Sequence, residues 1–152
     1  MTSIRTATLN DVGTIHRLGE SVSEFSVSGT TVTFWPEDVL QDAIESDDVV
    51  VLVAEDQQQI VGFIIASYSR GLLKTTIENI YVIPENRSKG LGDKMLATLL
   101  QVLSERKCEY VATLIPTDAR NALSLYERAG FTRGETLLWL DKSLSDNFKS
   151  AR

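Results

Sequence analysis

The stretch from Val82 to Met95 has the sequence VIPENRSKGLGDKM, in which the pattern of side chains changes twice. An apolar strand ends before Pro84, a polar loop follows, and leucines recur at helical spacing after Gly90. The first turn of a helix carries unpaired backbone N–H groups and a partial positive charge. The stretch therefore predicts an anion-binding turn between a strand and a helix.

The loop residues favour a phosphate as that anion. Gly90 and Gly92 leave the backbone open to close approach, and Arg87, Lys89 and Lys94 add positive charge. The alternative interpretation is an ordinary helix start, with glycines for the turn and lysines for solubility. The chain has no GxxxxGK motif followed by Ser or Thr, and GLGDKM lacks the third glycine of GxGxxG. These absences exclude a P-loop and argue against a Rossmann dinucleotide site.

The residues around this stretch predict one mixed α/β sheet flanked by helices, in the order β-α-α-β-β-β-α-β-α-β-β. Expected strands span 3–8, 49–55, 60–69, 74–83 and 110–115, expected helices span 11–25, 36–44, 90–107 and 121–129, and a terminal turn and strand span 131–134 and 136–141. The step from strand 74–83 through the long helix to strand 110–115 is a crossover, which we expect to be parallel and right-handed.

The length of 152 residues and the 43% hydrophobic content fit a single domain with a buried core. The longest apolar run, from Val49 to Ala54, is too short to span a membrane. Because the first ten residues also lack the apolar core of a secretory signal, we expect a cytoplasmic protein with no membrane partner. Single Cys108 and His16 residues argue against a disulfide and a histidine-rich metal site, so we expect no metal.

The net charge of −6 is distributed unevenly along the chain. Ten acidic and no basic residues lie between Leu18 and Ser69, whereas the remaining 100 residues contain 11 acidic and 15 basic ones. This asymmetry predicts a cationic partner near the first half and an anionic partner near the second. It argues against nucleic-acid binding, which needs a basic surface. The alternative is that the acidic residues only solvate surface helices.

Two short motifs resemble those of the GNAT superfamily of N-acetyltransferases. RSKGLG at residues 87–92 matches the family pattern of Arg or Gln, two residues, Gly, one residue, and Gly or Ala. ALSLYERAGF at residues 122–131 resembles the family block AxxLYxxxGF. The order of elements over residues 3–142 is also similar to that fold. The resemblance extends to the ribosomal-protein branch and, through IENIYV at 77–82, to the polyamine and aminoglycoside branches.

The resemblance implies a single N-acetyltransferase domain over residues 1–152, with a polar tail at about 144–152. It also implies acetyl transfer from acetyl-coenzyme A to a primary amine, by direct attack in a ternary complex. The loop would bind the pyrophosphate, the pantetheine arm would lie along a strand edge like an added strand, and a backbone N–H near Val82 would polarise the thioester carbonyl. The implied cofactor-binding residues are Ile80, Tyr81, Val82, Arg87, Ser88, Lys89, Gly90, Leu91, Gly92 and Asp93.

Two residues are candidates for proton transfer. Simple strand alternation places Glu78 on the same face as Ile80 and Val82, and the resemblance implies that Glu78 is the general base. The resemblance also implies that Tyr126 protonates the departing thiolate. The alternatives are a solvent-facing strand glutamate and an aromatic residue of the core, respectively.

The acceptor is expected to be cationic, because the fold would place the acidic stretch from Glu20 to Asp56 on the acceptor side. A polyamine, an aminoglycoside-like amine and a basic peptide N-terminus all fit this expectation. Phe25, Phe34 and Trp35 would form either an apolar wall for the acceptor or part of the core. A homodimer is possible in this family, with the last strand as the contact. The alternative function is a non-catalytic module that binds or senses acyl-coenzyme A.

Overall fold

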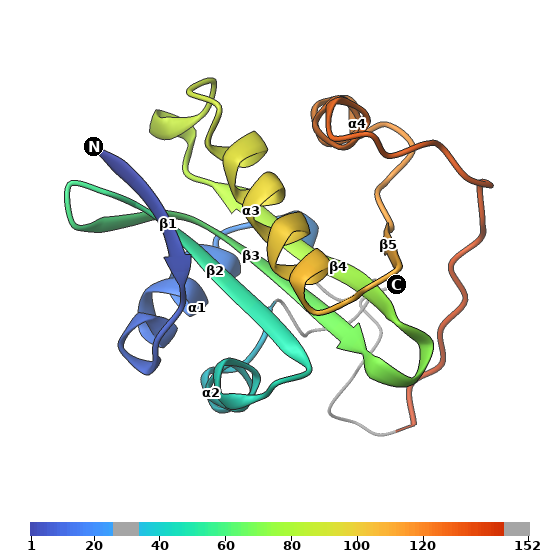
Figure 1. Cartoon of the computed structure of the whole chain (residues 1–152), viewed down its shortest axis with the longest axis horizontal. Helices are drawn as coiled ribbons and strands as arrows, with labels where there is room; N and C mark the ends of the chain where they lie inside the picture. The colour runs from blue at the N-terminus through green and yellow to red at the C-terminus, as the bar shows by residue number, and fades with distance from the viewer. Residues whose placement is uncertain (26–33, 145–152) are drawn as a thin grey trace.

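The computed structural model describes residues 1–25 and 34–144, and it contains one five-stranded sheet in the order β1-β2-β3-β4-β5 (Figure 1). The strands are β1 (Thr2–Thr6), β2 (Val49–Asp56), β3 (Gln59–Ser69), β4 (Lys74–Val82) and β5 (Tyr110–Thr113). The first four strands pair antiparallel, and β5 pairs parallel to β4. The expected mixed sheet and its parallel crossover are confirmed.

Helices cover both faces of the sheet (Figure 1). The α-helices are α1 (Val12–Glu20), α2 (Glu37–Glu45), α3 (Leu91–Glu105) and α4 (Arg120–Arg128), and short 3-10 turns are η1 (Leu9–Asp11), η2 (Ser23–Phe25), η3 (Arg70–Leu72) and η4 (Pro84–Asn86). The first helix is shorter than expected, because α1 ends at Glu20 and Phe25 belongs to η2. None of the helices in the described part of the chain is long and apolar enough to cross a membrane.

Two apolar clusters form the core, one on each face of the sheet. On one face α3 contributes fully buried side chains at three- and four-residue spacing, namely Leu91, Met95, Leu96, Leu99 and Leu103. On the other face α1 and α2 pack on β2 and β3 around Phe63, which has no exposed surface. Burial of a large apolar side chain stabilises the fold by about 1.5–3 kcal/mol. These clusters therefore fix the sheet between its two helical layers.

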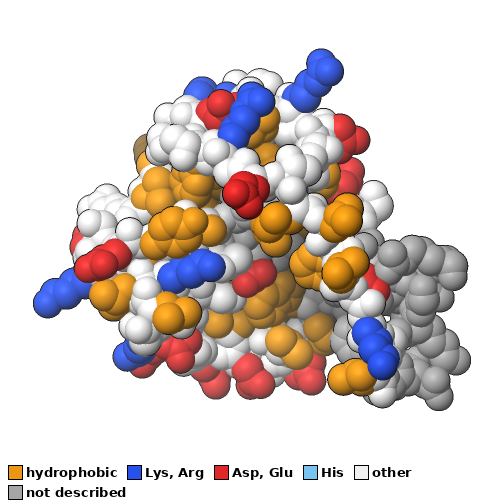
Figure 2. Space-filling model, turned by 90° about the vertical axis from the view of Figure 1, so that its right-hand side faces the viewer, with side chains coloured by type: hydrophobic (Ala, Val, Ile, Leu, Met, Phe, Trp, Pro, Cys, Tyr) orange, Lys and Arg blue, Asp and Glu red, His pale blue; other side chains and the backbone are white. Residues whose placement is uncertain are grey.

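Residues 131–141 differ from the prediction, because no strand forms there in the described part of the chain. The exposed fractions of Leu137, Leu138, Trp139 and Leu140 are 71%, 89%, 62% and 87%. A strand needs a neighbouring strand to satisfy its backbone, and this segment runs apart from the sheet at the right of Figure 1. Figure 2 faces this side of the molecule and shows hydrophobic side chains at its surface.

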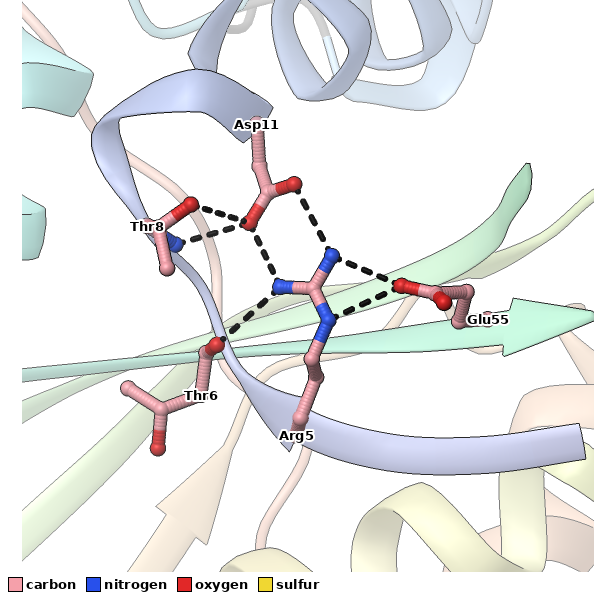
Figure 3. Close-up of polar contacts among 5 residues, drawn as sticks. All are labelled: Arg5, Thr6, Thr8, Asp11 and Glu55. Carbon is pink, nitrogen blue, oxygen red and sulfur yellow. Dashed lines mark hydrogen bonds and ion pairs between the residues drawn. The ribbon is translucent and has the colours of Figure 1, made fainter. Parts of the chain in front are cut away.

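An ionic network connects β1 to β2 and to the start of α1 (Figure 3). The Arg5 guanidinium donates two hydrogen bonds to Asp11, at 2.7 and 3.1 Å, and its Nε donates to Glu55 at 2.9 Å. Asp11 also accepts hydrogen bonds from the backbone N–H and the hydroxyl of Thr8. The hydrogen bonds from Arg5 and Thr8 hold the pKa of the buried Asp11 carboxyl below its usual value.

We expect Asp11→Asn to lower the free energy of unfolding by about 2 kcal/mol at pH 7, because the part-buried guanidinium of Arg5 loses its negatively charged partner. A carboxyl whose folded pKa is lowered contributes stability above its unfolded pKa, and this contribution is lost as the pH falls through the folded value. The difference between the variant and the wild type should therefore shrink below about pH 4. Urea unfolding at pH 7 and pH 3 measures this difference.

Asp42→Asn, on the exposed side of α2, is the control and should match the wild type. An equal difference in the free energy of unfolding at both pH values would contradict the stabilising role of the ionised Asp11 carboxylate.

Candidate active site

Strands β4 and β5 separate partway along their length. β5 pairs with β4 only from Lys74 to Ile77, whereas β4 continues to Val82. The Thr113 hydroxyl donates a hydrogen bond to the Ile77 carbonyl at 3.0 Å, at the last paired position. Beyond this point, the edge of β4 that faces β5 has no strand partner in the described part of the chain. This open edge includes Ile80, Tyr81 and Val82, so an extended ligand has room to add to the sheet there.

The loop before α3 has the conformation of an anion cradle. Ser88 and Gly90 have φ angles of 65° and 75°, in the left-handed region that glycine adopts without strain. The amides of residues 88–93 donate no backbone hydrogen bond within the described residues, and the first bond of the helix runs from the Lys94 amide to the Gly90 carbonyl at 3.0 Å. N–H groups without a backbone acceptor therefore gather at the positive end of α3.

Two charged side chains support this loop from the outside. The Arg87 Nε donates to the Val82 carbonyl at 2.8 Å, and the guanidinium lies 5.5 Å from the centre of the Tyr81 ring. Arg87 thus braces the loop against the end of β4. Arg128 of α4 donates to both carboxylate oxygens of Asp93, at 3.0 and 3.3 Å. This contact lowers the pKa of Asp93 and offsets its negative charge beside the amides.

A β-bulge lies at Glu78. Asn79 pairs with Ile65 and Ile77 pairs with Ala66, so Glu78 has no partner on β3. Ile77 and Ile80 both pack toward the cluster around α3, although simple alternation would put them on opposite faces. The expected alternation of Glu78, Ile80 and Val82 is therefore interrupted by the extra residue. Glu78 itself is exposed, next to the place where β4 and β5 separate.

Tyr126 lies on the inner face of α4, where only 4% of its surface is exposed. Its ring packs edge-on against Phe131, with the ring centres 5.1 Å apart. Burial raises the pKa of the Tyr126 phenol, and an interaction with the Thr113 hydroxyl lowers it by a smaller amount. Tyr126 is thus both a core aromatic and a phenol that keeps its proton at neutral pH.

Thr113 lies where β4 and β5 separate, and sequence reasoning missed it. Its hydroxyl bonds to the carbonyl of Ile77, the residue before Glu78, and it also interacts with Tyr126. The signal for Thr113 in the sequence is weak, because its place in the site follows only from its position at the end of the pairing between β4 and β5. The structure therefore brings the bulge of β4, the end of β5 and α4 together beside the open strand edge.

The aromatic residues near the expected acceptor side have different surroundings. Phe34 is 5% exposed and stacks with Phe25 at 5.8 Å, so Phe34 belongs to the core. Trp35 donates from its indole N–H to the Asn79 side chain at 2.9 Å, and its carbonyl lies 2.9 Å from the His16 ring. Trp35 and Asn79 thus adjoin the bulge. Sequence reasoning did not single out Asn79.

Ion pairs neutralise part of the acidic stretch. Glu55 binds Arg5, Asp56 contacts the N-terminal amine, and both Asp47 and Asp48 contact Arg70. On α2, the exposed acidic side chains are Glu37, Asp38, Asp42 and Glu45. Figure 2 shows several acidic side chains along the lower border of the face that it draws. The ion pairs therefore leave the exposed carboxylates of α2 as part of the negative charge of this stretch.

Comparison with protein families decides the identity of the chain. The family described as an acetyltransferase (GNAT) domain matches residues 47–133, which include β2 to β5, α3, α4 and the loop 87–92. The chain belongs to the GNAT family of acetyltransferases. It is an acetyl-coenzyme A-dependent N-acetyltransferase, as the two sequence motifs predicted.

Individual GNAT proteins are similar over most of the chain. An uncharacterised N-acetyltransferase of Bacillus subtilis, YhfO, is 25% identical over 133 residues, covering 85% of this chain and 89% of the relative. The solved structure of an aminoglycoside acetyltransferase from an uncultured soil metagenomic sample, in complex with sisomicin, has a TM-score of 0.78 at 20% identity, covering 95% of this chain and 97% of that one. The PaiA N-acetyltransferase of Thermoplasma acidophilum, in complex with coenzyme A, has a TM-score of 0.75 at 16% identity, covering 90% and 92%.

The site of this GNAT chain fits acetyl-coenzyme A. Free amides and a left-handed glycine at the start of α3 suit a pyrophosphate, and the unpaired edge of β4 suits an extended amide-containing arm. At Gly92 a Cβ atom would lie 3.6 Å from the Leu125 side chain, which is an ordinary van der Waals contact, so the packing of α3 on α4 does not require a glycine there. Within the described residues, no three His, Cys, Asp or Glu side chains form a group that would hold a metal ion.

Proposed function

We propose that this enzyme acetylates the primary amine of a cationic acceptor, by direct attack in a ternary complex with acetyl-coenzyme A. The observation that carries the proposal is the arrangement around Thr113, where β4 and β5 separate. The Thr113 hydroxyl donates to the carbonyl of Ile77, the residue before Glu78, and Tyr126 packs in the same apolar cluster as Ile77, beside the open edge of β4. This arrangement supports Glu78 as the base and Tyr126 as the acid, beside the edge that suits the thioester arm.

The roles of the chain's own residues follow from proton balance. Bound acetyl-coenzyme A supplies an acetyl group on a thioester. An alkylammonium has a pKa near 10.4, so it is almost fully protonated at pH 7 and must lose a proton before it can attack. Glu78 accepts this proton, directly or through water, and Tyr126 donates a proton to the sulfur that leaves. The nitrogen loses a second proton as the amide forms, and this proton returns to the Tyr126 phenolate through water, so that the reaction leaves one proton on Glu78. A backbone N–H near Val82 stabilises the carbonyl oxygen as negative charge develops on it.

The charge distribution supports a cationic acceptor. The exposed carboxylates of α2 attract a polyamine, an aminoglycoside-like amine or a basic peptide N-terminus from solution. Salt screens such attraction over about 8 Å at physiological ionic strength. The value of KM for the acceptor should therefore rise with salt, whereas the affinity for an uncharged amine should change little.

The proposal is tested by titrating acetyl-coenzyme A calorimetrically and then measuring thiol release with spermidine, an aminoglycoside and a basic peptide. We expect binding, followed by release with at least one of these acceptors. Binding without release on any of them would favour the alternative, a non-catalytic acyl-coenzyme A module.

Gly90→Glu is the matched negative control for this titration. It places a carboxylate and a strained backbone at the amides, and we expect it to weaken acetyl-coenzyme A binding by about tenfold or more. Gly71→Glu puts the same charge on η3, where a side chain meets open space, and should bind normally. Equal binding by wild type and Gly90→Glu would overturn the assignment of the loop.

A further inference from the structure

One acidic residue lies in the turn that we assign to the pyrophosphate of acetyl-coenzyme A. The turn at 87–94 has the sequence RSKGLGDK, in which Asp93 is the only acid beside three basic residues. Asp93 is the third residue of α3 after the N-cap Gly90. An acidic side chain at that position typically turns back and accepts a hydrogen bond from the backbone N–H of the N-cap residue. Asp93 is therefore a competitor for the amides that a pyrophosphate needs.

An aspartate at this position can reach the amide, as the start of η1 shows. Asp11 is the third residue of η1 after its N-cap Thr8, and its carboxylate accepts a hydrogen bond from the Thr8 backbone N–H at 2.7 Å. Arg5 binds the same carboxylate without preventing this contact. The place from which an arginine approaches, and not its charge alone, therefore decides whether the aspartate reaches the amide.

Asp93 binds an arginine that comes from a different helix. The Nε of Arg128, at the end of α4, donates to one oxygen of the Asp93 carboxylate at 3.0 Å, and its Nη2 donates to the other oxygen at 3.3 Å. Besides this guanidinium, the carboxylate interacts with its own backbone amide. Within the described residues it makes no hydrogen bond with the Gly90 amide. The forked contact with α4 thus replaces the capping contact.

This ion pair is not what holds α4 in place. The side chains of Arg128 and Asp93 are 57% and 47% exposed, and exposed ion pairs contribute little to folding. Leu125 and the buried Tyr126 hold α4 instead, because both pack in the apolar cluster around α3. The main consequence of the pair is therefore the position of the Asp93 carboxylate.

We propose that Arg128 is a positioning residue, which holds the Asp93 carboxylate away from the amides at the start of α3 so that they bind the pyrophosphate. Without Arg128, the carboxylate caps the Gly90 amide, and its uncompensated charge repels the phosphates. Because Arg128 lowers the pKa of Asp93, the carboxyl is ionised at neutral pH, where the enzyme would be assayed. The inference rests on the assignment of the loop to acetyl-coenzyme A, but not on the acceptor or the proton-transfer roles.

Calorimetric titration of acetyl-coenzyme A into three variants tests the proposal. Arg128→Gln should raise the Kd by about tenfold, because the released carboxylate competes with the pyrophosphate. Asp93→Asn should lower the Kd by about threefold, because it removes the competing charge and leaves the guanidinium uncompensated. The double variant Asp93→Asn/Arg128→Gln should return to within about twofold of the wild type, because the residue that Arg128 restrains is no longer charged.

The double variant separates positioning from the two other roles that Arg128 can have. If the ion pair only braced α3 against α4, Asp93→Asn would weaken binding as much as Arg128→Gln. If Arg128 touched the cofactor directly, the double variant would stay as weak as Arg128→Gln. Either result would overturn the proposal, and so would an unchanged Kd for Arg128→Gln.

A second ligand shows which part of the cofactor is affected. 3′-Dephospho-coenzyme A keeps the pyrophosphate and lacks the 3′-phosphate, so Arg128→Gln should weaken its binding and that of coenzyme A by the same factor. A loss confined to coenzyme A would mean that Arg128 binds the 3′-phosphate, which contradicts the proposal.

Arg133→Gln is the matched control. Arg133 is 69% exposed, lies just after α4 and pairs with Glu127 at 3.1 Å, so the exchange removes the same charge and a similar ion pair. It should bind acetyl-coenzyme A like the wild type, and a loss equal to that of Arg128→Gln would point to net charge and overturn the proposal. Gly90→Glu tests the loop itself. If Gly90→Glu weakens binding and Arg128→Gln does not, the assignment of the loop stands and the role of Arg128 is wrong.

Discussion

Glu78→Gln should lower kcat by about a hundredfold or more, with the affinity for acetyl-coenzyme A unchanged. Glutamine keeps the size of the side chain but does not accept a proton from the acceptor ammonium, and loss of a positioned base typically costs a factor of 10² to 10⁴. The exchange should not disturb folding, because Glu78 is exposed and has no partner on β3. Steady-state kinetics with a saturating amine at pH 7 measures the loss.

The pH dependence separates a lost base from a lost contact. Without Glu78, only the free amine reacts, and its fraction rises about tenfold per pH unit below the amine pKa near 10.4. The rate of the variant should therefore approach that of the wild type between pH 7 and pH 9. Glu85→Gln changes an exposed carboxylate on η4 and is the control. A deficit that is constant over this pH range, or one shared by Glu85→Gln, would rule out Glu78 as the base.

Much of the fold was predictable because local and global signals agree there. The leucine spacing of α3 matches its buried face, and the loop before α3 has a glycine, Gly90, at a left-handed position. The polar residues between β2 and β3 form the expected tight turn, with Gln57 and Gln58 at φ angles of 50° and 66°. In these segments, neighbouring residues alone determine the structure.

The remaining features depend on contacts that sequence spacing does not show. The bulge at Glu78 arises from the pairing of β4 with β3, so simple alternation misplaced the residues before it. Thr113 and Asn79 are identified by their contacts in the fold. The Thr113 hydroxyl bonds to β4, and the Asn79 side chain accepts a hydrogen bond from Trp35. The expected terminal strand had the right composition, but in the chain as described it has no neighbour to pair with.

Tyr126→Phe should also lower kcat by about a hundredfold, because the departing thiolate loses its proton donor. Since burial raises the phenol pKa above its ordinary value of 10, Tyr126 stays protonated throughout the neutral range. The wild-type rate should therefore show no fall between pH 7 and pH 9.5 from loss of this proton. Thiol release with saturating amine and acetyl-coenzyme A measures the effect.

A purely structural role for Tyr126 gives a different result. Phenylalanine keeps the ring that packs against Phe131, so the free energy of unfolding should change by less than about 1 kcal/mol, comparable to one neutral hydrogen bond. Tyr110→Phe removes the hydroxyl of an exposed tyrosine on β5 and should retain full activity. If Tyr126→Phe keeps kcat within about twofold of the wild type, Tyr126 is a core aromatic only, and water or another group protonates the thiolate. A large loss of kcat with unchanged stability and unchanged acetyl-coenzyme A affinity leaves proton donation as the remaining role of the hydroxyl, because packing and cofactor binding are then both intact.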